Sequence, residues 1–352
     1  MTKFVLTKGF LLALLLPIAL FGLQVPTAKA DTANGNLFFT TFSGGENVWN
    51  VSYNFNGTAF TLGTPTGIAA TNGADGLLLA PDGNLIIAGQ GTDLLHEITT
   101  TGTPVNTFGA GTGAFHMALS SNAGNATLYT LWNGPFSGGS TAIAATVLSG
   151  GGLSVAGTPY TVSCAVPGGC STDVRGVIFD PVNGKWYYST APDGGSGTFG
   201  IVVFNDVTHT ATLTQLLSGV FAHGVSFDPF THDIIMNSAG TIQQYDPTTN
   251  TIVSSLTGVG NFDQAAEDGK GHLFVASNSG LLEFVDYDTT GLIGSAGNFT
   301  AEPFLKGSLD DIAPLSGAGS TATPEPSSLM LLGSGLMGLL GMSRRRLARL
   351  AS

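Results

Sequence analysis

The chain has 352 residues, of which 43% are hydrophobic and only 10% are charged, and its formal net charge is −12 at pH 7. Most basic residues lie near the two ends, so residues 31–326 hold four basic and twenty-three acidic side chains, a net charge of −19. Such an acidic surface repels nucleic acid and anionic lipid, which excludes binding to a phosphate backbone and leaves cations or neutral glycans as partners.

The first thirty residues have the features of a secretory signal peptide. Two lysines precede an apolar run from 9 to 23, and Ala28 and Ala30 occupy the small-residue positions before a cleavage site. The alternative is a membrane anchor that is never cleaved, but the run is shorter than the roughly twenty residues that a span requires. We therefore expect residues 1–30 to be removed on export.

The body of the chain, residues 31–316, is rich in Gly, Ser, Thr and Asn and has no helical period, which favours short strands and tight turns. Similar units recur along it, among them "VRGVIFDPVNGKWYYSTAP" from Val174 and "AHGVSFDPFTHDIIMNSAGTIQQYDPTTNTIVSSL" from Ala222. Each unit has an apolar strand, a turn often built on Asp-Pro or Asp-Gly, and further strands. Four strands in about forty to fifty residues is the size of a propeller blade.

The two ends of the body complement one another. The segment from Gly35 has the second, third and fourth strands of a unit but no first strand, and the segment from Ser308 has only a first strand. The pattern therefore predicts an all-β fold, a six-bladed β-propeller with circular closure of its N- and C-terminal strands. Five or seven blades, or an open β-sandwich or solenoid, are the alternatives, and the spacing stretches between 114 and 173.

Aligning the units places one polar residue before the apolar run of every first strand: Asp75, His116, Arg175, His223, Asp263 and Asp310. The first strand of a propeller blade lines the central channel, so these residues should converge at its mouth, with Asp311 as a fourth carboxylate. One interpretation is a wet channel in which Arg175 forms salt bridges with the acids. The other is a ligand site that holds a sugar or other small polar ligand, or a divalent metal ion at His116 and His223.

The repeat resembles the six-bladed families grouped around gluconolactonases, virginiamycin B lyase and the NHL repeats, over residues 35–316. Gluconolactonase-like hydrolases hold a divalent metal with a Glu, Asn and Asp set, and the predicted ring has neither Glu nor Asn. Virginiamycin B lyase-like enzymes use His with a metal, which His116 and His223 could match. We expect a binding or structural component of the cell envelope or exopolysaccharide matrix, with a metal-dependent lactonase or lyase as the alternative.

The remaining cysteines and histidines give weaker signals. Cys164 and Cys170 are neighbours in a Gly/Pro-rich loop of an exported chain, which predicts a local disulfide rather than a metal or redox site. The other histidines are interpreted as surface or filler residues: His96, His209, His232 and His272.

The C-terminus combines three ordered parts after a flexible linker at 317–323. The tail, 324–352, has the tripeptide Pro324, Glu325 and Pro326, an apolar stretch that predicts a transmembrane helix, and a cluster with Arg344, Arg345 and Arg346. It resembles the PEP-CTERM sorting signal of Gram-negative bacteria, and a plain C-terminal anchor is the alternative. The resemblance implies an exosortase-type membrane protease as partner. The positive-inside rule places the body outside, tethered to the inner membrane until processing passes it to the cell surface or extracellular matrix.

Overall fold

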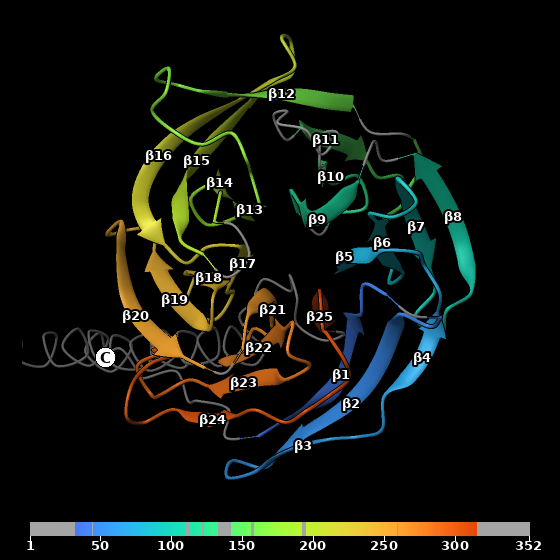
Figure 1. The fold of residues 1–352 in the computed structure, drawn as a ribbon, viewed down its shortest axis with the longest axis vertical. Helices are drawn as coiled ribbons and strands as arrows, with labels where there is room; N and C mark the ends of the chain where they lie inside the picture. The colour runs from blue at the N-terminus through green and yellow to red at the C-terminus, as the bar shows by residue number, and fades with distance from the viewer. Residues whose placement is uncertain are drawn as a thin grey trace, which may run out of the picture.

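The computed structural model describes residues 32–314 except 44, 110–112, 122, 133–141, 156–157, 192–194 and 259. The predicted signal peptide (1–30), linker (317–323) and sorting tail (324–352) lie outside this part. Within it, the regular elements are all β-strands, and no helix of membrane-spanning length and apolarity is found. The sheets are arranged around a common centre, as in a propeller (Figure 1).

One sheet contains both ends of the described chain, in the order β25-β1-β2-β3 with β4 beside β2. Its strands are β1 (Ala33–Thr40), β2 (Val48–Phe55), β3 (Phe60–Leu62), β4 (Thr66–Ala69) and β25 (Ile312–Pro314). β25 pairs antiparallel with β1, with Ala313 opposite Phe38. The C-terminal strand is thus an edge strand of a sheet whose other strands come from the N-terminus, and it lies closest to the central hollow (Figure 1).

Three further sheets are four-stranded meanders in which each strand pairs with the next. The first holds β5 (Ala74–Leu79), β6 (Leu85–Gly89), β7 (Leu94–Ile98) and β8 (Pro104–Gly109). The second holds β17 (Gly224–Phe227), β18 (Ile234–Ser238), β19 (Thr241–Asp246) and β20 (Thr251–Thr257). The third holds β21 (Phe262–Glu267), β22 (His272–Ser277), β23 (Leu282–Asp286) and β24 (Phe299–Ala301).

The remaining strands form one eight-stranded sheet, made of two four-stranded runs. They are β9 (Ala114–Leu119), β10 (Thr127–Trp132), β11 (Ala142–Val147), β12 (Thr158–Cys164), β13 (Gly176–Asp180), β14 (Lys185–Ser189), β15 (Gly197–Asn205) and β16 (Thr210–Val220). The outer strand β12 lies parallel to β16, with Thr161 opposite Thr210. A disulfide between Cys164 and Cys170, whose Cα atoms are 5.8 Å apart, fixes the loop that follows β12.

The Asp-Pro turns of the repeats form because the aspartate carboxylate replaces the backbone partners that the turn lacks. Asp180 Oδ1 accepts the backbone N–H of Val182 at 2.8 Å, and Gly184 closes the turn at φ 71°. Asp228 Oδ1 accepts the N–H of Phe230 at 2.9 Å in the next unit. These Asx turns reverse the chain between the first and second strands of a unit.

The apolar core is divided into clusters that fill the spaces between neighbouring sheets. Phe55, on β2, packs against Phe284 of β23 with ring centroids 5.1 Å apart, and Phe60 stacks on Phe284 at 4.0 Å. Between β14 and β19, Tyr187 and Tyr245 are in edge contact. Because both faces of a sheet are covered, strands such as β22 are buried along their whole length. This packing fixes where the innermost strands lie around the hollow.

Candidate functional site

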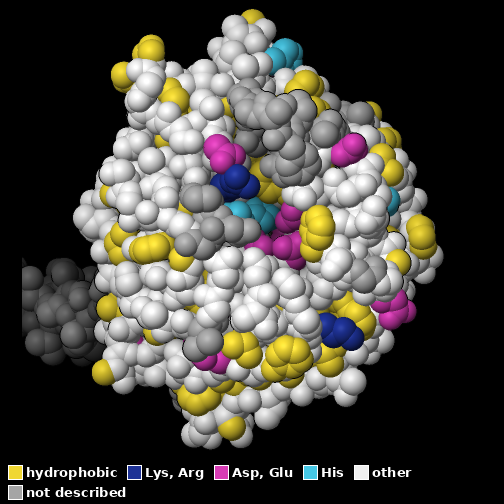
Figure 2. Space-filling view, in the orientation of Figure 1, with side chains coloured by type: hydrophobic (Ala, Val, Ile, Leu, Met, Phe, Trp, Pro, Cys, Tyr) yellow, Lys and Arg dark blue, Asp and Glu magenta, His cyan; other side chains and the backbone are white. Residues whose placement is uncertain are grey.

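The six polar residues predicted to form a ring all lie at the starts of the innermost strands. Asp75, His116 and Asp263 are early residues of β5, β9 and β21, whereas Arg175, His223 and Asp310 come directly before or near the starts of β13, β17 and β25. Figure 2 shows basic, imidazole and acidic side chains gathered at the central hollow. The inner strands therefore bring together residues from every part of the chain.

Glycines after the ring residues allow this convergence. A Cβ on Gly76 would lie 2.4 Å from the carbonyl oxygen of Phe115, and one on Gly224 would lie 2.0 Å from that of Asp263. Real Cβ atoms do not approach so closely, so only glycine lets neighbouring inner strands come this near. The Asp-Gly and His-Gly pairs in the repeats are thus part of the site.

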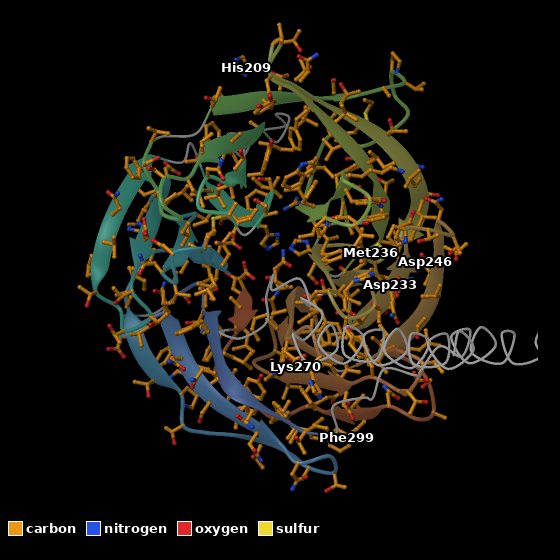
Figure 3. All side chains as sticks on the ribbon, turned by 180° about the vertical axis from the view of Figure 1, so that it is seen from behind. His209, Asp233, Met236, Asp246, Lys270 and Phe299 are labelled. Carbon is orange, nitrogen blue, oxygen red and sulfur yellow. A yellow bond between two sulfur atoms is a disulfide. The ribbon has the colours of Figure 1, made fainter. Side chains whose placement is uncertain are left out.

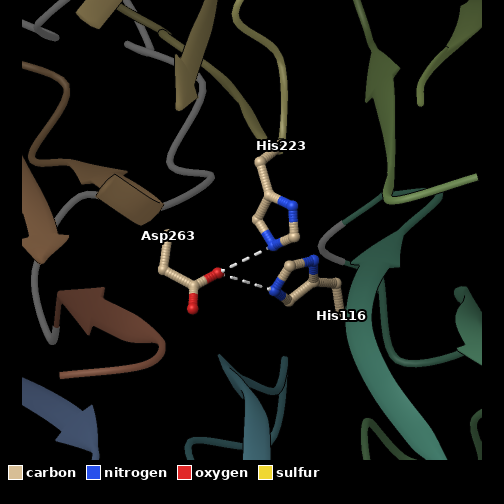
Figure 4. A group of neighbouring side chains, drawn as sticks. All are labelled: His116, His223 and Asp263. Atoms are coloured by element: carbon tan, nitrogen blue, oxygen red, sulfur yellow. Dashed lines mark hydrogen bonds and ion pairs between the residues drawn. The ribbon is translucent and has the colours of Figure 1, made fainter. Parts of the chain in front are cut away.

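Three of the ring residues form its centre: His116, His223 and Asp263. Both imidazole Nε2 atoms lie 3.2 Å from the same oxygen, Oδ1 of Asp263 (Figure 4). One ligand atom from each of the three residues lies within 4.8 Å of the others, and all three residues are buried. This is the only such group of metal-ligating side chains within the described ranges.

The two histidines are oriented by the backbone on their other side. Nδ1 of His116 lies 2.7 Å from the carbonyl oxygen of Arg175, and Nδ1 of His223 lies 3.1 Å from that of Ala191. A carbonyl oxygen only accepts hydrogen bonds, so each Nδ1 carries a hydrogen and donates it. Each Nε2 is therefore the atom left to meet Asp263, either with a second proton or with a lone pair for a metal ion.

The charges at the centre depend strongly on one another. Burial lowers the pKa of His116, but the hydrogen bond and charge of Asp263 outweigh it and raise that pKa to about 10. Burial alone would raise the pKa of Asp263, yet the hydrogen bonds and charges of the two histidines hold it well below its usual range. Without a metal ion, the centre is thus an ion pair between the Asp263 carboxylate and an imidazolium at His116.

The other carboxyl groups lie around this pair. Asp75 Oδ1 is 3.8 Å from Nε2 of His116, and its Oδ2 accepts a hydrogen bond from Gln90 at 2.7 Å. Burial, and then the charges of Asp75 and Asp263, raise the pKa of Asp310 well above its ordinary value. Oδ2 of Asp310 is buried and has no hydrogen-bond partner among the described residues. A protonated carboxyl at Asp310 therefore faces the centre of the ring.

Asp311 is a structural member of the site. Its Oδ2 accepts the N–H of Leu77 on β5 at 2.7 Å, and its own N–H donates to Thr40 Oγ1 at 3.0 Å. Burial raises the pKa of Asp311 to about 7, against the opposing charge of His116. Asp311 thus ties the C-terminal strand to both neighbouring strands. Its place beside Asp310 was visible in the sequence, but its backbone partners were not.

One arginine and one histidine differ from simple expectations, whereas a second histidine agrees with them. Arg175 donates to Asp173 at 2.9 Å, so its guanidinium turns to a sequence neighbour and away from the salt bridges expected with the ring acids. His272 is neither a surface residue nor inert filler, because it is buried with Nδ1 2.7 Å from Oδ2 of Asp268. His209 lies exposed in a turn at φ 49°, as the sequence suggested.

Sequence reasoning missed the backbone groups that orient the site and the polar groups deeper in the channel. The carbonyl of Ala191, which holds His223, lies in a loop without a motif. Gln264 and Glu267, on the same strand as Asp263, are buried on the channel wall. The only available signal was polar residues in a strand whose neighbours are apolar.

Comparison with known proteins identifies the tail and the fold. Residues 322–346 match the PEP-CTERM protein-sorting motif. This motif indicates an exported protein and implies processing by an exosortase, a membrane protease. A search among curated proteins found no relative of the chain by sequence.

Among solved structures, the chain is similar to a periplasmic gluconolactonase from Pseudomonas aeruginosa, with a TM-score of 0.53 and 13% identity over 81% of this chain and 100% of that one. A candidate 6-phosphogluconolactonase from Bacteroides uniformis gives a TM-score of 0.49 and 13% identity, over 79% of this chain and 98% of that one. A protein of unknown function from Bacteroides caccae gives a TM-score of 0.47 and 14% identity, over 80% of this chain and 99% of that one. At such identities the likeness concerns the fold alone. The chain is therefore an exported protein with a propeller-like β-domain and a C-terminal PEP-CTERM sorting motif.

Proposed function

We propose that residues 31–316 form a six-bladed β-propeller that closes through β25. In support, each of the six clusters of buried apolar side chains packs between two neighbouring units, which are the four smaller sheets and the two halves of the eight-stranded sheet. The eight-stranded sheet counts as two blades, since its halves pair as strands only through the outer strands β12 and β16. Closure through β25 joins the two ends of the domain in one sheet, so that the circle of blades has no open end.

We further propose that the channel mouth binds one divalent transition-metal ion through His116, His223 and Asp263. The single observation that carries this proposal is that two imidazole Nε2 atoms converge on one carboxylate oxygen while their Nδ1 hydrogens are held by backbone carbonyls. Backbone acceptors of this kind orient histidine ligands in metal sites. Two nitrogens and one oxygen suit Zn²⁺, Mn²⁺ or Fe²⁺ better than Ca²⁺ or Mg²⁺, which prefer oxygen alone.

The surrounding carboxyl groups suit a ligand rich in hydroxyl groups. Asp75 offers an acceptor beside His116, and Asp310, when protonated, offers a donor close to Asp75 and Asp263. Imidazole and acidic side chains are visible near the centre of the face drawn in Figure 2. With the export signals, this favours a binding component of the cell envelope or exopolysaccharide matrix. In this proposal the signal peptide is removed and the tail tethers the protein to the inner membrane until processing.

The second candidate is a metal-dependent lactonase or lyase at the same site. A bound metal ion would polarise a carbonyl or lower the pKa of a coordinated water. The observation that favours catalysis is the raised pKa of Asp310, since a buried carboxyl that keeps its proton can act as a general acid. Asp75, 3.8 Å from His116, could hold the attacking or departing oxygen in position. The fold similarity to a gluconolactonase is consistent with this candidate but does not carry it.

Metal content tests the site directly. The purified protein, dialysed after exposure to Zn²⁺ or Mn²⁺, should retain about one equivalent of metal by elemental mass spectrometry, and the His116→Ala/His223→Ala variant should retain none. The matched control is His209→Asn/His232→Asn, because these histidines are exposed in turns with φ 49° and 66° that asparagine tolerates. His209 lies at the periphery, far from the hollow (Figure 3). Equal metal in all three proteins, or none in the parent, would refute the site.

Two further assays separate the candidates once metal is bound. A binding component should retain exopolysaccharide in a sedimentation assay and lose it when the metal is chelated, without releasing acid from aldonolactones. A lactonase should acidify a lactone solution, and the Asp310→Asn variant should lower kcat while it leaves the metal content unchanged. If the protein retains no polysaccharide and also turns over no lactone, both proposed functions are contradicted.

A further inference from the structure

A cavity of about 430 Å³ lies along the inner strands below the ring. It begins at Asp311 and Leu77, beside the site described above, and reaches Ser121, Pro181 and Pro229, which follow the ends of β9, β13 and β17. The volume is within the range of small-molecule sites. The cavity therefore opens at the end of the channel opposite to the histidines.

The two sides of the cavity differ in polarity. Leu79 on β5, Met117 on β9 and Ile178 on β13 give an apolar side. On the other side, β17 and β21 contribute Ser226, Gln264 and Glu267, all of which are buried. Apart from Asp311 and Ser121, the polar lining groups thus lie on two adjacent strands, whereas most of the surface is apolar.

Glu267 is the chemical centre of the polar side. The hydroxyl of Ser226 donates a hydrogen bond to its Oε1. Burial, and then the charge of nearby Asp228, raise the pKa of Glu267 well above its ordinary range. The carboxyl therefore keeps its proton near neutral pH and can donate it to an oxygen in the cavity.

The charges restrict the ligand further. No lining residue is Lys, Arg or His, so the lining offers no positive charge to pair with an anion, and burying an unpaired charge is unfavourable. A purely polar ligand would leave the aliphatic side without contacts, and a pure hydrocarbon would leave the Glu267 hydrogen-bond donor unpaired in the cavity. The ligand must therefore be uncharged, mainly aliphatic, and able to accept one hydrogen bond.

We propose that this cavity binds a neutral amphiphile, a mainly aliphatic small molecule whose single hydroxyl or carbonyl oxygen hydrogen-bonds to Glu267. The aliphatic part lies against Leu79, Met117 and Ile178, and the oxygen lies on the side of β21. This site is separate from the histidines, so it does not depend on the metal proposed above.

Displacement of the neutral fluorophore N-phenyl-1-naphthylamine from the purified protein tests the proposal, with 1-decanol, decanoate and decane as competitors. Decanol should displace the fluorophore, and decanoate should do so at least about tenfold more weakly because it carries a charge. Equal displacement by decanol and decanoate, or no binding of the fluorophore, would overturn the proposal.

Variants locate the binding. Leu79→Trp should abolish binding of both the fluorophore and decanol, because the larger side chain fills the aliphatic side of the cavity. Val207→Trp, at a position 91% exposed in a turn, should leave their binding unchanged. Glu267→Leu should weaken the affinity for decanol by about tenfold but leave the affinity for decane unchanged. Glu267→Gln keeps a neutral hydrogen-bond donor, so its affinity for decanol should equal that of the parent. Melting temperature confirms that each variant is folded. Binding that survives in folded Leu79→Trp would place the ligand elsewhere and refute the site.

The metal variant distinguishes the two proposals. The His116→Ala/His223→Ala protein should bind decanol as the parent does, since neither histidine lines the cavity. Loss of decanol binding in this folded variant would show that the channel is one site and would overturn a separate amphiphile site.

Discussion

His116 makes a pH-dependent contribution to stability that can be isolated with the His116→Gln variant. In the metal-free protein, Asp263 and the neighbouring acids raise the pKa of His116 to about 10 from the ordinary 6.5. The folded state therefore binds this proton more tightly than the unfolded state does. The stabilisation is fully present below pH 6.5 and is lost as the pH rises through about 10.

The size of the effect follows from the two pKa values. A folded pKa of about 10 and an unfolded pKa of 6.5 correspond to about 4 kcal/mol of stabilisation at pH 7 and about 1 kcal/mol at pH 9. Glutamine at 116 keeps a donor toward Asp263 but cannot titrate. The difference in unfolding free energy between parent and variant should therefore shrink by about 3 kcal/mol between these pH values.

Urea unfolding of both proteins in EDTA, at intervals between pH 6 and pH 9.5, measures this difference. Groups whose pKa does not depend on His116, such as Glu283, cancel in the subtraction, whereas Asp311, whose pKa burial raises and the charge of His116 lowers, does not cancel fully. If the two stability curves run parallel over this range, His116 is not held as an imidazolium by Asp263, and the account of the centre given above is wrong. Addition of Zn²⁺ should stabilise the parent alone and release a proton near neutral pH, because the metal replaces the proton on Nε2.

Four further changes have defined outcomes. Cys164→Ser should lower the free energy of unfolding by about 2 kcal/mol in urea, as should reduction of the parent. Phe284→Ala should cost between about 3 and 5 kcal/mol in the same assay, since it empties a buried aromatic cluster. Burial and the neighbouring Glu302 raise the pKa of Glu283 to about 8 from 4.5, so parent stability falls as pH rises between these values and Glu283→Gln should flatten that part of the melting-temperature curve. Arg175→Ala should cost less than about 1 kcal/mol and leave the metal content unchanged, because its ion pair is part-exposed and His116 contacts only its carbonyl.

The positions of the ring residues at the starts of the inner strands could be predicted because two sequence signals in each repeat locate the strand. The apolar run after each polar residue marks the inner strand, and the Asp-Pro or Asp-Gly turn after it marks where that strand ends. His116 and Asp263 are 147 positions apart in the chain, yet the shared register within their units places both at the same height in the channel. Convergence is thus a consequence of local patterns repeated around a ring.

The partners of each side chain could not be predicted in the same way. Arg175 pairs with Asp173, two positions away, and not with the more distant ring acids. Forming a pair between near neighbours in sequence costs less conformational entropy. The polar side of the cavity depends on which faces of β17 and β21 turn inward, and strand twist decides this rather than composition. The parallel contact of β12 with β16 joins two units by their outer edges, where the repeat pattern is weakest.

The pairing of β25 with β1 also has a consequence for processing of the tail. The first sheet needs residues 312–314 as its inner strand, and the sorting motif begins at 322, only a few residues later. No shorter portion of the chain can complete that sheet, so a chain translocated unfolded from its N-terminus would complete it only after residue 314 has crossed. A protease that cuts within the motif would act C-terminal to every described strand. Its cut would leave intact the sheet that joins the two ends of the described chain.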